Sequence, residues 1–452
     1  MFPREIKGSG TRSERAAKPI SQLLLSYIYM AQKGEAELQE NIFKEHLETK
    51  SIFKRDRDIL RPSYIPEKLL HRDEQINQIA SILTSALRGD QPSNILIFGK
   101  TGTGKTATAK YLGKEIKKAA DTLPEPLKDV RYIYINCEVV DTQYGVLQNI
   151  GNHFIENFDE RIPPTGWSTE RVYNILWEKI DDKPKVVVVV LDEIDRFVYK
   201  SGDDTIYHLT KINDDLKNAK ISLIGISNDL KFTELLDPRV RSRLSDEKIV
   251  FPPYDADQLR DILVQRADMA FEKGVIGEGV ISLCAAVEAH EHGDARRALD
   301  LLRVAAEIAE RERETEINEN HVIKAKNKIE LDCVIEAVRT LPLQSKLVLL
   351  GILLGEENGN SKQMTGDVYG AYKELAKKSS TALLTQRRVA DLISELDMMG
   401  LVSARVKSFG RGGRTREILV SVPLMETKRV LEKDPMLEQV KGYRLKMQST
   451  LM

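Results

Sequence analysis

The sequence contains a segment whose glycines, lysine and threonine are spaced to bind phosphate groups. The stretch from Gly99 to Thr106, GKTGTGKT, fits the pattern G-x-x-x-x-G-K-[ST] and stands between the apolar run Asn94–Phe98 and a helical stretch that begins at Lys105. The glycines let the backbone aim successive N–H groups at phosphate oxygens, and the helix N-terminus adds positive potential. Lys105 then reaches the β- and γ-phosphates, and Thr106 ligates Mg²⁺. The expected phosphate contacts are Gly99, Lys100, Thr101, Gly102, Thr103, Gly104, Lys105, Thr106 and Ala107.

Two acids and one amide follow further apolar runs. Asp192 and Glu193 come directly after Val186–Leu191, and Asn228 follows Ile221–Ile226. In open α/β sheets, ligands sit at the carboxyl ends of the strands. Asp192 is therefore expected to hold Mg²⁺ through water, Glu193 to polarise the water that attacks the γ-phosphate, and Asn228 to orient that water. The alternative is that these polar residues form solvated turns, which their types also favour.

The elements that must position these side chains are short strands that alternate with helices. Apolar runs and amphipathic stretches alternate across residues 61–253, which predicts an α/β domain with a parallel sheet between helices. Val186–Leu191 has no polar alternation, as expected of a strand covered on both faces.

The pattern becomes helical after Pro253. Asp255 and Gln258 form a capping box, and Asp294 and Asn318 can cap two more helices, so residues 254–330 are predicted to form a small helical domain.

The C-terminal part reads as a winged-helix module over residues 331–435, with a tail at 436–452. Helical stretches are followed by two strand-like runs, Leu401–Lys407 and Thr415–Val422, which flank a glycine-rich tip. A helix followed by a hairpin is typical of this module. Residues 1–60 form an N-terminal extension that is expected to be partly mobile.

Composition limits the function classes. The 452 residues carry 68 Lys and Arg against 69 Asp and Glu, a net charge of -1 that argues against non-specific coating of nucleic acid by the whole surface. Three widely spaced cysteines offer neither a disulfide framework nor a Cys-x-x-Cys metal site and favour a reducing compartment. The longest strong apolar run is far shorter than the roughly 20 residues that cross a bilayer. We expect a cytoplasmic, nucleoid-associated protein without a membrane partner.

Together these motifs resemble an AAA+ P-loop ATPase. The phosphate loop, Asp192-Glu193, Asn228, the arginine segment Asp237–Leu244 and the stretch Gly293–Asp300 carry this resemblance. More narrowly, the chain resembles the archaeal replication initiators of the origin-recognition/Cdc6 type.

The narrower resemblance lies in the segment Tyr64–Glu74, which is similar to the family's segment that cups adenine. It implies ATP or ADP with Mg²⁺ as cofactors, and adenine contacts from Tyr64, Ile65 and Arg72. It covers about Arg61 to Val422.

The resemblance also implies roles for two arginines. Arg296 is similar to the sensor-2 arginine of the helical lid, through which the lid reports on the γ-phosphate; the alternative is that Arg296 and Arg297 are merely solvated residues at a helix start. Arg243 matches the arginine-finger position, which acts on the nucleotide of a neighbouring subunit. The implied catalytic set is Glu193, Asn228, Arg296 and Arg243.

Two places in the winged-helix module are candidates for DNA contact. Arg387 and Arg388 open a helix whose apolar residues must face the core, so that its polar start can enter a major groove. The hairpin Ser403–Arg416 holds five basic residues and no acid, which suits phosphate contact. The expected hairpin contacts are Arg405, Lys407, Arg411, Gly412, Gly413, Arg414 and Arg416. The alternatives are a solvated first helical turn and a solvated hairpin.

The resulting hypothesis is an ATP-switched initiator that binds double-stranded origin DNA and recruits or loads the minichromosome maintenance (MCM) replicative helicase, with slow hydrolysis ending the competent state. Further initiator copies on DNA are possible partners. Two alternatives stay open: a clamp-loader-like AAA+ motor, and a signalling ATPase whose winged helix binds protein.

Overall fold

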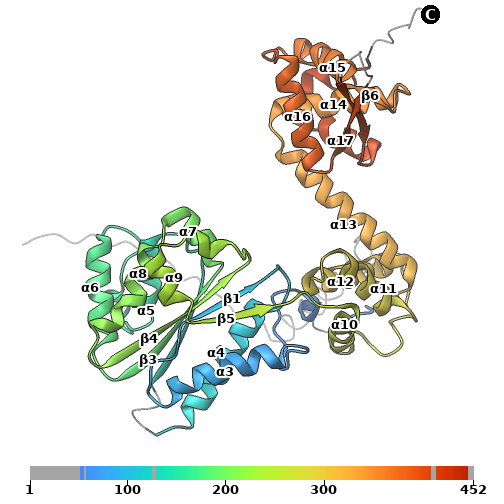
Figure 1. Cartoon of the computed structure of the whole chain (residues 1–452). Coiled ribbons are helices and arrows are strands. Elements are labelled where there is room, and N and C mark those ends of the chain that lie inside the picture. The colour runs from blue at the N-terminus through green and yellow to red at the C-terminus, as the bar shows by residue number, and fades with distance from the viewer. Residues whose placement is uncertain (1–50, 55–56, 125–128, 409–413, 446–452) are drawn as a thin grey trace, which may run out of the picture.

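The computed structural model describes residues 51–54, 57–124, 129–408 and 414–445 (Figure 1). Within this part, an α/β domain, a group of lid helices and a winged-helix module follow one another along the chain. The predicted fold class is confirmed. No helix in these ranges is long and apolar enough to cross a membrane.

The α/β domain is built on a parallel sheet. In the described residues, five strands lie in the order β2-β3-β4-β1-β5, and each neighbouring pair is parallel. Their bounds are β1 Ile95–Gly99, β2 Val130–Asn136, β3 Lys185–Asp192, β4 Ala219–Ser227 and β5 Glu247–Phe251. β3 is buried along its whole length, as its unbroken apolar run predicts. β5 was not predicted, because three of its five residues are exposed and its sequence begins with two charged residues.

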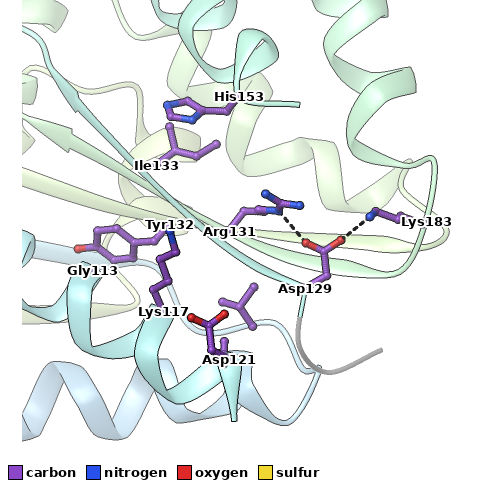
Figure 2. A pocket seen from close by; sticks show the side chains of 11 residues that line it. Gly113, Lys117, Asp121, Asp129, Arg131, Tyr132, Ile133, His153 and Lys183 are labelled. Carbon is purple, nitrogen blue, oxygen red and sulfur yellow. Dashed lines mark hydrogen bonds and ion pairs between the residues drawn. The ribbon is translucent and has the colours of Figure 1, made fainter. Parts of the chain in front are cut away.

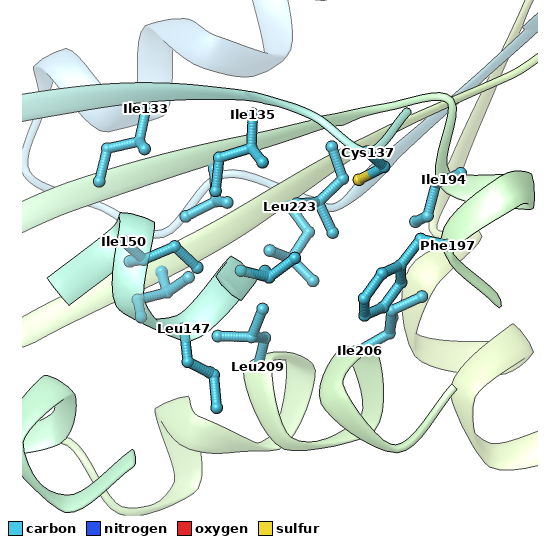
Figure 3. Packing of buried hydrophobic residues seen from close by; sticks show 14 of the residues in the cluster. Ile133, Ile135, Cys137, Leu147, Ile150, Ile194, Phe197, Ile206, Leu209 and Leu223 are labelled. Carbon is cyan, nitrogen blue, oxygen red and sulfur yellow. The ribbon is translucent and has the colours of Figure 1, made fainter. Parts of the chain in front are cut away.

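Helices cover both faces of this sheet. On one face, α3 Asp73–Leu87 and α4 Lys105–Asp121 pack against alternate strand residues such as Ile95, Ile97 and Val188. The other face is covered by α5 Gln143–Asn152, α6 Thr169–Ile180, α7 Ile194–Ser201, α8 Asp204–Lys211 and α9 Pro238–Leu244. Figure 3 shows part of this second cluster, with Ile133 and Ile135 of β2 above Leu147 and Ile150 of α5. The alternation of strand side chains thus gives each face its own apolar layer.

The lid helices form a separate apolar cluster. They are α10 Ala256–Ala270, α11 Val280–Glu291, α12 Ala295–Arg311 and the first half of α13 Glu319–Thr340. The three predicted caps are confirmed: Asp255 and Asn318 each form a capping box, and Asp294 accepts the N–H groups of Arg296 and Arg297. Phe53, from the predicted N-terminal extension, lies 5.0 Å from Phe271 between ring centroids and is buried in this cluster.

The winged-helix module begins where α13 leaves the lid. Its helices are α14 Leu343–Glu357, α15 Thr365–Lys378, α16 Gln386–Met398 and α17 Leu424–Glu432, and its strands are β6 Gln363–Met364, β7 Val402–Ser408 and β8 Arg414–Val420. The described strands pair antiparallel in the order β6-β8-β7. Val322 of α13 is buried in the lid cluster and Val338 in the winged-helix cluster, so one helix belongs to both cores.

Short 3₁₀ turns complete the described elements: η1 Arg57–Leu60, η2 Phe158–Glu160, η3 Ile212–Asp214, η4 Phe232–Glu234 and η6 Pro435–Val440.

Candidate functional site

The predicted phosphate loop connects β1 to α4. Gly102 and Gly104 have φ angles of 75° and 89°, in the left-handed region that favours glycine. A Cβ on Gly104 would lie 2.7 Å from the Tyr254 hydroxyl oxygen, and one on Gly102 would lie 1.7 Å from Oδ1 of Asp294. The backbone conformation and the close approach of the lid therefore both require glycine at these positions.

A polar cavity lies over the loop and gathers side chains from four elements. It is lined by Thr101, Gly102, Thr103, Gly104, Lys105, Thr106, Asp192, Glu193, Asn228 and Arg296. We call it the phosphate cavity. The loop, the ends of β3 and β4 and the start of α12 meet here, so the structure brings together the predicted groups that are separated by up to 195 residues in sequence (101 to 296).

Lys105 is held inside this cavity by three acceptors. Its Nζ donates to the carbonyl oxygens of Gly99 (2.8 Å) and Lys100 (2.7 Å) and to Oδ1 of Asn228 (2.8 Å). Burial lowers the pKa of Lys105 to about 8, although Asp192 opposes the shift. Gly99 and Lys100 do not line the cavity, but their carbonyls orient the lysine. An anion bound near Nζ would favour its charged form.

Thr106 and Asp192 form a pair of oxygen donors suited to Mg²⁺. Thr106 Oγ1 donates to Oδ2 of Asp192 over 2.8 Å, and the Tyr134 hydroxyl donates to the same oxygen over 2.6 Å. Asp192 as a whole is 4% exposed. Mg²⁺ prefers hydroxyl, carboxylate and water oxygens, so this donor set fits the ion that the motif implies. Tyr134 was missed because only the strand register places β2 beside Asp192.

Glu193 occupies a strained turn between β3 and α7. Its φ of 56° is rare for a residue with a side chain and is typical of functional sites. Burial raises its pKa, while Arg196, whose Nε lies 2.9 Å from Oε2, opposes the shift. The carboxylate thus lines the phosphate cavity but is tethered to Arg196, which no motif in the sequence marks.

The structure distinguishes the two adjacent arginines of the lid. Arg296 lines the phosphate cavity, whereas Arg297 turns to lid acids, with 3.5 Å to Glu288 and 3.3 Å to Glu291. The lid also contacts the phosphate loop directly, since the Ala295 N–H donates to the Gly102 carbonyl over 3.3 Å. The first turn of α12 therefore closes one side of the site.

A second, less polar cavity joins the first and is suited to a nucleoside. The two share Gly102, Gly104, Thr106 and Arg296, and the second is also lined by Tyr64, Ile65, Ala107, Tyr254, Arg266 and Leu299, among others. Arg266, missed in the sequence, donates to the Tyr64 carbonyl over 3.0 Å and lies 4.7 Å from the centre of its ring.

Arg72 differs from its expected position against adenine, because it lines neither cavity. Its guanidinium is buried and donates to the carbonyls of Thr103 (2.9 Å) and Pro252 (2.7 Å). It also stacks 3.7 Å from the centre of the Tyr254 ring. Arg72 therefore connects the phosphate loop to the segment between β5 and α10 and does not line the cavity.

Arg243 lies outside both cavities. It is half-exposed on α9, where its guanidinium lies 3.3 Å from Oδ2 of Asp214 and donates to the Thr210 carbonyl over 3.3 Å. If Arg243 acts on a nucleotide, a neighbouring subunit must bind that nucleotide, as the predicted arginine-finger role requires.

The predicted DNA contacts fall into distinct environments. Thr385 caps α16, Arg387 is exposed there, and Arg388 lies 3.4 Å from Glu395. On the hairpin, Arg405 and Lys407 are exposed, and Lys407 pairs with Glu417 at 3.0 Å.

Arg416 points inward, donating to the Ala390 carbonyl over 3.1 Å and to Ser394, so it ties the hairpin to α16. Arg411, Gly412 and Gly413 lie outside the described residues, as does the side chain of Arg414.

Comparison with protein families and relatives covers most of the chain. Three family models match the chain. The AAA domain model matches residues 88–232, the Cdc6 AAA+ ATPase-type lid domain model matches residues 260–327, and the CDC6 C-terminal winged helix domain model matches residues 336–430. The chain is 53% identical over 414 residues to ORC1-type DNA replication protein 1 of Methanosarcina acetivorans, covering 91% of this chain and 96% of the relative. It is 54% identical over 403 residues to the ORC1-type DNA replication protein of Pyrococcus furiosus, covering 89% and 95%.

Among solved structures, the chain is similar to the Aeropyrum pernix ORC1 protein in complex with DNA. The TM-score is 0.70 and the identity 44%, over 86% of this chain and all of that one.

Proposed function

This chain belongs to the family of ORC1-type DNA replication proteins, and from this premise we propose that it is an ATP-dependent initiator that binds double-stranded origin DNA and recruits or loads the MCM helicase. The main support for this proposal is a single cavity, closed by the lid, that is lined by Lys105, Asp192, Glu193, Asn228 and Arg296. A winged helix with exposed basic residues on its hairpin supplies the DNA-binding part.

The residues of the phosphate cavity take complementary roles in this proposal. Bound ATP with Mg²⁺ supplies the reactive γ-phosphate. Lys105 exchanges its three oxygen acceptors for phosphate oxygens, and Thr106 and Asp192 hold the metal. Glu193 would accept a proton from water as the water oxygen bonds to the γ-phosphorus and the bond to the departing ADP breaks. Asn228 would orient that water once Lys105 has left its amide. Arg296 contacts the γ-phosphate and so connects the nucleotide to α12.

Hydrolysis is proposed to be slow and switch-like. Glu193 is paired with Arg196 and Asn228 with Lys105, so two groups needed for attack must first change partner. This change of partners would slow hydrolysis, which suits a protein that acts through the nucleotide it has bound and not through rapid turnover. Arg243 is proposed to act on the nucleotide of a further initiator copy on the same DNA.

We also propose the domain division expected from the sequence, with the α/β domain at 61–253, the lid at 254–330 and the winged helix at 331–435. Separate apolar clusters in the lid and the winged helix support it.

Genome-wide mapping of the DNA that the protein occupies, followed by mapping of MCM, tests this function. The expected result is occupancy at a few discrete sites, with MCM at the same sites only when the protein is present. Uniform occupancy, or MCM loading that does not depend on the protein, would refute it. Binding to a partner protein without DNA would favour the signalling alternative.

A further inference from the structure

Among the residues that the structure describes, β2 leaves one edge of the sheet open, because it is the terminal strand and pairs with β3 alone. The Asp129 carbonyl accepts the Val186 N–H over 3.1 Å, so residue 129 and every second residue after it face β3. The backbone N–H and C=O groups of Val130, Tyr132 and Tyr134 therefore face outward. Across the residues described, no hydrogen bond engages these outward groups. Such an edge is a template for another strand.

A groove of about 510 Å³ runs along this edge between α4 and α5 (Figure 2). Gly113 and Lys117 of α4 form one wall, and His153 at the end of α5 stands on the other. The Tyr132 ring lies directly over Gly113, where an added Cβ would be 2.6 Å from ring carbons. The absent side chain at Gly113 thus lets the tyrosine pack flat against α4.

Basic side chains dominate the groove. Lys117, Arg131 and Lys183 line it, and an adjoining cavity that shares Asp129 adds three more basic residues, Arg88, Lys185 and Lys220. The lining acids across both cavities are Asp121 and Asp129.

Asp129 is already neutralised within the groove. Burial raises the pKa of Asp129, but hydrogen bonds from Lys183 and Arg131 outweigh this effect and lower it. The carboxylate lies 3.0 Å from Nζ of Lys183 and 2.7 Å from Nε of Arg131. Burial, Arg131 and Arg161 lower the pKa of His153, so it is neutral near pH 7.

Two exposed cations remain available to a ligand. Neither Arg88 nor Lys117 has an ion-pair partner among the described side chains.

We propose that the free edge of β2 binds an extended acidic segment of a partner protein as an added strand. Unpaired backbone donors and acceptors recognise the main chain of a peptide. Lys117 in the groove selects carboxylates along it, and Arg88 in the adjoining cavity meets those that lie beyond the start of the strand. Duplex DNA has no backbone that can continue a sheet, so the open edge favours a peptide. The groove lies where β3 begins, whereas the nucleotide site lies where β3 ends, so this inference is independent of the proposed function.

The test uses the full chain and a fluorescent, end-capped peptide of alternating Thr and Glu, with binding followed by fluorescence anisotropy. We expect saturable binding and slower amide hydrogen exchange in residues 130–134. The double variant Arg88→Glu/Lys117→Glu should bind about tenfold more weakly, because it reverses two exposed charges. Lys114→Glu should bind like the wild type, because Lys114 is exposed on the same helix but outside the groove.

A second measurement does not depend on the variants. A peptide of the same sequence with N-methylated backbone amides should lose binding to the wild type, since it cannot pair with the strand. Equal binding of the methylated peptide, equal binding of an alternating Thr and Lys peptide, or unchanged affinity in the double variant would overturn the proposal. Duplex DNA could also displace the acidic peptide from the wild type but not from the double variant. That result would overturn the proposal and show that the groove binds nucleic acid.

Discussion

Single residues of the phosphate cavity are held by bonds that a nucleotide would replace. Lys105 is charged but buried, and its acceptors are two carbonyls and the Asn228 amide. Phosphate oxygens would be stronger acceptors for an ammonium group than these neutral oxygens. A bound nucleotide can therefore replace these internal contacts.

The pKa of Lys105 predicts how ATP affinity depends on pH. In the free protein burial lowers it to about 8, and bound phosphates favour the charged form and raise it again. Affinity should be constant below pH 8 and fall above it, approaching about tenfold per pH unit, because binding then requires uptake of a proton. Calorimetric titration at several pH values measures this. A flat profile across the alkaline range would show that Lys105 is already fully charged in the free site.

Glu193→Gln should retain ATP and lose hydrolysis by about 10²–10⁴-fold, because the amide keeps the shape of the side chain but cannot take a proton. Single-turnover hydrolysis and equilibrium binding, measured in parallel, separate the two effects. Glu138→Gln is the control, since Glu138 pairs with Arg196 at 2.6 Å but lies outside the cavity. Wild-type hydrolysis by Glu193→Gln would mean that another group activates the water.

Among the elements, α12 links the nucleotide site to the lid through its cap. Asp294 accepts two N–H groups of the first turn and its carboxylate lies against Gly102. Asp294→Ala should lower the free energy of unfolding by about 1 kcal/mol and also change ATP affinity. Asn318→Ala removes a comparable cap on α13 and should lower stability alone. Denaturant unfolding with ATP titration compares them, and identical ATP affinity in both variants would show that the cap does not position the loop.

The hairpin of the winged helix offers a second test at this scale. Arg405 is exposed on β7, so Arg405→Ala should flatten the slope of log affinity against log salt by about 0.9 for one lost phosphate contact. Arg416→Ala should instead lower stability, because Arg416 donates to α16. Duplex titrations at several salt concentrations decide this, and an unchanged slope for Arg405→Ala would remove it from the interface.

Local patterns explain which elements and site residues could be predicted. The phosphate loop, the caps and the acids after β3 each depend on neighbours within a few positions, so the sequence reveals them. Arg266 contacts Tyr64 across 202 residues, and Tyr134 meets Asp192 only through the strand register. The contact of Arg72 with the Pro252 carbonyl could not be predicted for the same reason, since the two residues lie 180 positions apart.

At the scale of the whole molecule, one continuous set of contacts runs from the nucleotide site to the winged helix. Arg296 lines the phosphate cavity from α12, α12 packs on α13, and α13 ends in the winged-helix core at Val338. Figure 1 shows α13 as the connection between lid and winged helix. A movement of the first turn of α12 can therefore be transmitted through α13 to the winged helix.

The proposed switch requires that the phosphate cavity binds ATP. Equilibrium ATP binding by wild type, Lys105→Ala and Lys100→Ala tests it most directly. Lys100 is an exposed lysine of the same loop that does not line the phosphate cavity. We predict that Lys105→Ala abolishes measurable ATP binding, while Lys100→Ala binds ATP like the wild type. Unchanged ATP affinity in Lys105→Ala would contradict the site assignment and the switch that is built on it.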